Sequence, residues 1–181
     1  LWAKKRFELL KAGIGSLYKY TIIVILPLVL IIFSFAELII SVFFGKEFIL
    51  ASNALRILSI GMIFSTLYGV NVSFFSGIGK PEITSKIVYS GAIFNLISDI
   101  ILIPFLGIEG AAITTSISFA IMMGYGLMKM KSLIGIEFPL KVWSKSFIAG
   151  LLFVLLIWFL KRTIVLNVWI ETALVLLISG V

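Results

Sequence analysis

One acidic residue, Asp99, interrupts a stretch that is otherwise uncharged between Lys86 and Glu109. Gly91 and Asn95 precede it by eight and four residues, so the three share one face if the stretch is helical. If the stretch also crosses a membrane, an ionisable group there is costly and usually faces a bundle interior or a wet cavity. Asp99 is therefore the leading candidate for contact with a substrate or an ion. The competing interpretation is a structural carboxylate that is paired or protonated and bonded to a neighbouring helix.

Other uncharged polar residues lie in the neighbouring apolar stretches and are candidates for the same interior. They are Asn95, Asn71, Thr114 and Ser118. Hydroxyl groups at helical spacing more often bond the backbone or bridge two helices, so a structural role for them stays open.

Catalytic and metal chemistry find little support in the sequence. The chain has no Cys and no His, which excludes disulfides, thiol nucleophiles, imidazole bases and nearly all zinc chemistry. Gly79 and Lys80 are followed by Pro81 where a phosphate-binding loop needs Ser or Thr, and no loop carries a closely spaced acidic pair. We expect no enzyme, no metal site and no cofactor.

The elements that position these residues are predicted to be membrane-spanning helices. Of the 181 residues, 61% are apolar and only 13% are charged, which is too little polar surface for a soluble domain. A helix needs roughly 20 apolar residues to cross a bilayer, and the uncharged runs of this chain are near that length. They predict about six crossings. The predicted spans are 19–43, 55–78, 83–104, 109–128, 145–161 and 169 to the end. The fold class is therefore an all-α integral membrane bundle.

Three regions follow from this pattern. Residues 1–18 are basic and amphipathic, which is typical of a helix in the headgroup region, although an ordinary solvent-facing helix fits the same pattern. Residues 19–128 form a four-span core, and residues 145–181 hold two further spans, the last of them truncated. Because the chain opens on Leu1 and stops within an apolar run, we expect a piece of a longer polytopic protein.

The basic residues predict the orientation. Alternate loops place eleven of the 15 Lys and Arg residues on one side of the membrane, the side of the Gly79-Lys80-Pro81 turn. Lys and Arg near span ends are retained in the cytoplasm, so this turn is predicted to be cytoplasmic in a multi-pass cell membrane protein. The positive charge is spread over loops that flank lipid, which argues against nucleic acid as a partner.

Several residues are predicted to have structural roles. Gly61, Gly69 and Gly77 belong to a seam of small residues spaced four apart, which favours close helix packing. Glu37 and Arg56 lie near the ends of adjacent spans and are predicted to pair. Pro27 is expected to kink the first span.

The order of these features resembles a known family. The chain has Pro27 in its first span, Glu-Leu-Ile-Ile-Ser-Val-Phe-Phe-Gly at 37–45, Ala-Leu-Arg-Ile-Leu at 54–58, Ser-Gly-Ile-Gly-Lys-Pro at 76–81 and Gly-Ala-Ala-Ile-Thr-Thr at 110–115. This is similar to the C-terminal half of Wzx-like polysaccharide flippases of the multidrug, oligosaccharidyl-lipid and polysaccharide exporter superfamily. The resemblance covers residues 15–128 well and the last two spans only by count.

The resemblance implies a protein of two helical lobes around a central cavity, of which this chain is the C-terminal lobe. It implies alternating access on a lipid diphosphate-linked oligosaccharide, with membrane lipid and the N-terminal lobe of the same protein as partners. Asp99 stands where the family pattern more often has Asn or an apolar residue. Its role as a substrate contact, a site for a coupling cation or a bond to a neighbour therefore stays open.

Two other functions compete with the flippase. A cation-coupled multidrug exporter of the same fold would use Asp99 as its proton or sodium site. A third possibility, from a different class, is a polytopic membrane enzyme or assembly subunit, and an acidic pair on a loop outside this sequence would favour the enzyme.

Overall fold

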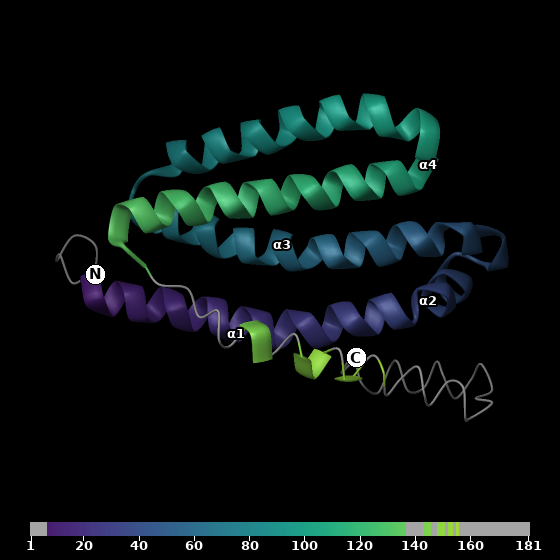
Figure 1. The fold of residues 1–181 in the computed structure, drawn as a ribbon, viewed down its shortest axis with the longest axis horizontal. Coiled ribbons are helices and arrows are strands. Elements are labelled where there is room, and N and C mark those ends of the chain that lie inside the picture. Colours follow the sequence, from purple (N-terminus) through teal and green to yellow (C-terminus); the bar gives the residue numbers. More distant parts are fainter. Residues whose placement is uncertain (1–6, 137–142, 146–147, 151, 154, 156–181) are drawn as a thin grey trace.

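The computed structural model describes residues 7–136, 143–145, 148–150, 152–153 and 155 (Figure 1). Every regular element in these ranges is helical, which confirms the predicted all-α class. The elements in chain order are α1 (Phe7–Ser34), α2 (Ala36–Phe43), the 3-10 helix η1 (Lys46–Ala51), α3 (Ser52–Gly77) and α4 (Pro81–Ile134).

The long helix α4 is a hairpin of two antiparallel arms (Figure 1). The chain reverses at Gly107, whose backbone angles of φ 56° and ψ −133° are not helical. The first arm, 81–106, continues two residues past Pro104, where the sequence predicted the helix to stop. Gly110 permits the tight return, because a Cβ on it would lie 2.7 Å from the carbonyl oxygen of Leu102. The arms correspond to the predicted spans 83–104 and 109–128.

Replacing Gly107 by alanine tests this corner. The φ of Gly107 is positive and no atom lies within 4 Å of an added Cβ, so the substitution acts through backbone strain alone. Strain of this kind costs about 1–3 kcal/mol. We expect Gly107→Ala to lower the thermal unfolding temperature of the detergent-solubilised protein. Gly13→Ala, in helical backbone with equally open surroundings, should leave it unchanged or raise it. Equal melting of Gly107→Ala and wild type would contradict the strained corner.

Helix α1 differs from the prediction at both ends. It runs without interruption from Phe7, so the segment expected to lie along the membrane surface and the first span form one helix. It also ends at Ser34, and α2 follows as a separate short helix, so the predicted span 19–43 is divided. A helix of 28 residues is about 42 Å long, which already exceeds the hydrocarbon core of about 30 Å. The chain can therefore turn at Phe35 after the crossing is complete. Pro27 lies inside α1 and does not end it.

Three stretches of helix are long and apolar enough to cross a membrane, by length and composition. They are Phe7–Ser34, Lys46–Gly77 and Pro81–Ile134, the last of which contains both arms of α4. The fifth and sixth predicted spans lie largely outside the described residues, so a total of six stays a prediction.

Helix α3 packs between α1 and the second arm of α4, 108–134, and the first arm lies on the far side of the second (Figure 1). The core between them is built from large apolar side chains, among them Leu67, Phe75, Ile87 and Met130. Helix α2 and the corner between the two arms of α4 lie at one end of the bundle, here called the α2 end (Figure 1). The opposite end, here called the Gly79 end, carries the turn between α3 and α4.

The small residues of α3 divide along its length. Gly61 lies against the second arm, where an added Cβ would be 2.5 Å from Ser116 Oγ. Gly69 and Gly77 are exposed and have no atom within 4 Å of an added Cβ. Within the described part of the chain the seam therefore packs at Gly61 and is uncovered at Gly69 and Gly77. A packing role for those two against another surface stays a prediction.

Candidate functional site

The first arm of α4 turns its polar stripe toward the second arm. Asn95 and Asp99 are half-buried between the arms, whereas Leu96, Ile97 and Ile100 on the other faces are exposed. The first arm thus turns Asn95 and Asp99 toward the second arm and presents apolar side chains outward. This is the arrangement expected when an ionisable residue must be kept away from lipid.

Asp99 is bonded across the hairpin. The fully buried Thr114 hydroxyl of the second arm donates to Asp99 Oδ1. When the Asn95 amide is turned to suit its neighbours, its nitrogen donates to Asp99 Oδ2 at 3.2 Å, and its oxygen accepts from the Thr115 backbone N–H at 3.3 Å. Both carboxylate oxygens therefore have donors, and the two arms are joined near the α2 end.

This site can accommodate either protonation state of Asp99. The single hydroxyl proton of Thr114 has two acceptors within reach, Asp99 Oδ1 and the Ala111 carbonyl oxygen at 2.9 Å. A charged Asp99 accepts the proton from Thr114. A neutral Asp99 donates its own proton to Thr114 Oγ1, whose proton then goes to Ala111. Either arrangement therefore leaves the Thr114 hydroxyl and the Asp99 carboxyl group with hydrogen-bond partners.

Asn71 and Ser118, predicted to line the same interior, lie in other surroundings. Ser118 is buried and its hydroxyl donates to the Thr114 carbonyl oxygen of its own helix at 2.8 Å. Asn71 is fully buried, accepts a hydrogen bond from the Tyr18 hydroxyl and donates to the Met123 carbonyl oxygen at 3.2 Å. Asn71 therefore links α1, α3 and the second arm.

Gly126 is the residue of the second arm that lies against Asn71. Neither Gly126 nor Tyr18 was identified from the sequence. A Cβ on Gly126 would lie 2.2 Å from Asn71 Nδ2 and 2.7 Å from Asn71 Cγ. The sequence offered a weak signal for Tyr18, which falls on the buried stripe of α1 with Ile14 and Ile22 at spacings of four. Nothing in the sequence distinguishes Gly126 from the neighbouring Gly124.

An uncharged polar strip occupies the uncovered face of α3 toward the Gly79 end. Its members are small and exposed: Thr66, Gly69, Ser73, Ser76 and Gly77. The hydroxyls of Thr66 and Ser73 donate to the carbonyl oxygens of Met62 and Gly69 in their own helix. A groove of about 290 Å³ runs beside the strip between α1 and α3, and Leu17, Ser73 and Gly77 are among the residues that line it.

A chain of polar contacts joins the helices at the α2 end. Arg56 Nη2 lies 2.7 Å from Glu37 Oε1, and Arg56 Nη1 donates to Asn53 Oδ1 at 2.9 Å. Asn53 Nδ2 in turn donates to Glu109 Oε1 at 3.1 Å. The pairing of Glu37 with Arg56 that the sequence predicted is thus part of a longer chain that links α2, α3 and the second arm of α4. Among the described residues no three His, Cys, Asp or Glu side chains gather where they could hold a metal ion.

A family model described as MatE matches residues 1–101. The chain is also 35% identical over 164 residues to uncharacterized membrane protein MJ1068 of Methanocaldococcus jannaschii, covering 91% of this chain and 32% of that protein. It is 26% identical over 156 residues to the probable low-salt glycan biosynthesis flippase Agl15 of Haloferax volcanii, covering 83% of this chain and 33% of that protein. No solved structure matches. The chain spans about a third of the length of these two relatives.

Proposed function

Since the chain belongs to the MatE family, whose members are transporters and not enzymes, we propose that it forms part of a flippase for lipid diphosphate-linked oligosaccharide. The flippase moves this lipid across the cytoplasmic membrane by alternating access. The carrier makes and breaks no covalent bond, so it needs a polar path for the headgroup and an apolar exit for the lipid tail.

The observation that carries the proposal is the strip Thr66, Gly69, Ser73, Ser76 and Gly77 on the uncovered face of α3. Small hydroxyl and glycine positions without charge suit a bulky, hydroxyl-rich glycan, because they leave room and offer hydrogen bonds without fixing one ligand tightly. The named glycan flippase among the relatives supports the choice of substrate class.

The rest of the transporter is proposed to face this strip. A chain that spans about a third of its relatives supports an arrangement in which an N-terminal lobe provides the opposite wall of the cavity. The exposed Gly69 and Gly77 suit that arrangement, because a second helix or a sugar can approach the α3 backbone there.

The orientation is proposed from charge. In the described part of the chain, the ends of α4 that meet the Gly79 turn carry Lys80, Lys86, Lys129 and Lys131, whereas η1 and the start of α3, next to α2, carry Lys46 and Arg56. This bias supports a cytoplasmic Gly79 end.

Asp99 is proposed to couple transport to a cation, with Asn95 and Thr114 as its partners. The two hydrogen-bonding arrangements of Asp99 and Thr114 support a proton as that cation. The same observation favours a second candidate function, a cation-coupled multidrug exporter of the same fold.

Reconstitution of the full-length protein that carries this chain tests the proposal. Vesicles are loaded with a lipid diphosphate oligosaccharide that carries a fluorescent label reducible by dithionite. We expect dithionite to reduce only the outer-leaflet label in protein-free vesicles and nearly all of it in vesicles with the transporter. Uptake of ethidium without movement of the labelled glycolipid would instead support the multidrug exporter.

A further inference from the structure

We propose that the corner formed by α2 and η1 binds the phosphate of an anionic membrane lipid in the leaflet at the α2 end. The proposal depends only on the chain crossing a membrane and not on what it transports. Lys46 and Arg56 are its cationic contacts, and the apolar side chains beside them anchor the corner among the acyl chains.

The first observation is a collar of exposed apolar side chains around the corner. Phe43 is 74% exposed, Phe44 63% and Leu50 86%, and Val42 and Phe48 are also exposed. So many large apolar groups in one short connection would be unfavourable in water, and they mark a surface that meets a membrane or a partner. Aromatic side chains are enriched at the level of lipid headgroups.

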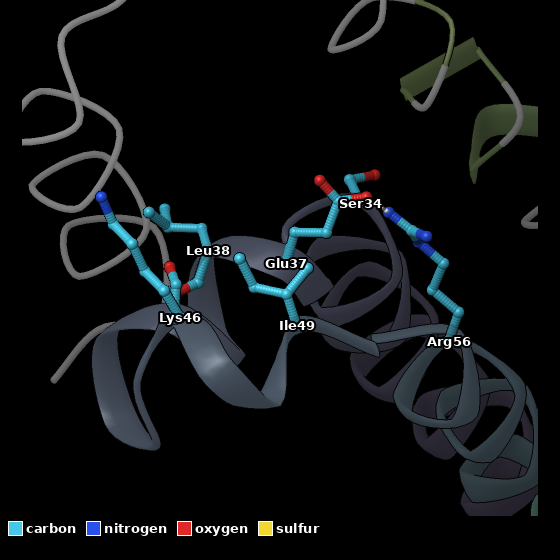
Figure 2. Close-up of a pocket in the computed structure, with 7 residues that line it drawn as sticks. Ser34, Glu37, Leu38, Lys46, Ile49 and Arg56 are labelled. Carbon is cyan, nitrogen blue, oxygen red and sulfur yellow. Dashed lines mark hydrogen bonds and ion pairs between the residues drawn. The ribbon is translucent and has the colours of Figure 1, made fainter. Parts of the chain in front are cut away.

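The second observation is a polar pocket of about 350 Å³ beside this collar. Arg56 and Glu37 face one another on one side of the pocket, and Lys46 stands on the other side, beyond Leu38 and Ile49 (Figure 2). The amino group of Lys46 points away from the ion pair in Figure 2, so its exposed side chain would turn inward to share an anionic group with Arg56 of α3.

The charges in the pocket leave an excess of positive charge. Glu37 is already paired with Arg56, and Lys46 belongs to neither of the two ion pairs among the described residues. Glu47, the other nearby acid, does not line the pocket; its side chain lies over Gly45, 3.8 Å from where a Cβ would be. Arg56 is held by Glu37 and Asn53 through two of its five donors, which fixes its guanidinium group in place.

The distribution of basic residues along the chain points to the same pocket. Only four of the 15 Lys and Arg residues are placed by the sequence on the α2 side, and two of these four line the pocket. A general electrostatic attraction to anionic lipid would not require the basic residues of this side to gather in one pocket. A lipid phosphate is favoured over a soluble anion because the collar holds the pocket at headgroup depth.

The test titrates the detergent-solubilised full-length protein with phosphatidylglycerol and follows its thermal unfolding. We expect the lipid to raise the unfolding temperature of the wild type. Lys46→Gln should weaken the apparent affinity about tenfold, because it removes one of the two cationic contacts to the phosphate. Lys46→Arg should retain it. Lys46 is exposed, so neither variant threatens the fold.

Three controls make the result decisive. Lys80→Gln, at the opposite end of the bundle, should leave the affinity unchanged. Inorganic phosphate should give no stabilisation, because it lacks the acyl chains. Equal stabilisation of Lys46→Gln and wild type by phosphatidylglycerol would overturn the proposal. Tighter, Lys46-dependent stabilisation by a lipid diphosphate oligosaccharide than by phosphatidylglycerol would also overturn it, by assigning the pocket to the transported substrate.

Discussion

Gly126→Ala is expected to lower the thermal unfolding temperature sharply. The added Cβ would lie 2.2 Å from Asn71 Nδ2, 2.7 Å from its Cγ and 3.0 Å from its Cβ, so rotation of the amide alone cannot relieve the contact. Asn71 must shift, and its bonds to Tyr18 and to the Met123 carbonyl oxygen break inside the core. Overpacking together with buried unpaired polar groups costs about 3 kcal/mol. Thermal unfolding in detergent measures the loss.

The neighbouring glycine provides the control. Gly124 lies on the same helix and has no atom within 4 Å of an added Cβ, so Gly124→Ala should melt close to the wild type. The double variant Gly126→Ala with Asn71→Ala should be more stable than the sum of the two single changes predicts, because the two closest contacts, to Asn71 Nδ2 and Cγ, are then removed. If the losses of stability from the two single changes simply add, the methyl group introduced at position 126 does not clash with Asn71.

Asp99→Asn is expected to reduce glycolipid transport about tenfold or more while the protein still folds, because an amide can neither bind nor release the proposed coupling proton. The substituted amide has the same shape, and its oxygen still accepts from Thr114. The Asn95 amide can turn so that its oxygen accepts from the new nitrogen. The variant therefore removes the ionisable group and keeps the link to Thr114, while the turned Asn95 gives up its hydrogen bond from the Thr115 backbone N–H. The dithionite assay and the folded yield are measured together.

Thr114→Val is the matched change. It removes one hydrogen bond from Asp99 and keeps the carboxylate. We expect a lower unfolding temperature, with transport per folded molecule closer to that of the wild type than in Asp99→Asn. Wild-type transport by Asp99→Asn at normal expression would instead assign Asp99 to packing alone.

Sequence patterns predicted what depends on local spacing. The uncharged runs located α1, α3 and both arms of α4, because a membrane-crossing helix must be long and apolar. The spacing of four between Asn95 and Asp99 predicted a shared face, and the exposed apolar residues on the other faces leave only the second arm for that stripe to meet. These features required no knowledge of how the helices pack.

Contacts between distant residues were not predictable in the same way. Asn71 and Tyr18 are 53 residues apart, and their pairing depends on the rotation of α1 against α3. The seam on α3 illustrates the limit. Residues spaced four apart advance about 40° around a helix at each step, so Gly69, two steps after Gly61, has turned away from the second arm. The periodicity was visible in the sequence, but the place where each glycine faces a neighbour depends on the packing.

The hairpin of α4 also constrains how the protein changes shape. Its two arms meet at Gly107, and a hydrogen bond between Thr114 and Asp99 joins them a few helical turns from that corner. If one arm slid past the other, the hydrogen bond between Thr114 and Asp99 would have to break and the backbone at Gly107 would have to distort at the same time. The two arms should therefore move as one rigid unit during a transport cycle. Any large displacement must then be absorbed outside the hairpin, at the 78–80 turn that leads into it or at the connections on either side of α2.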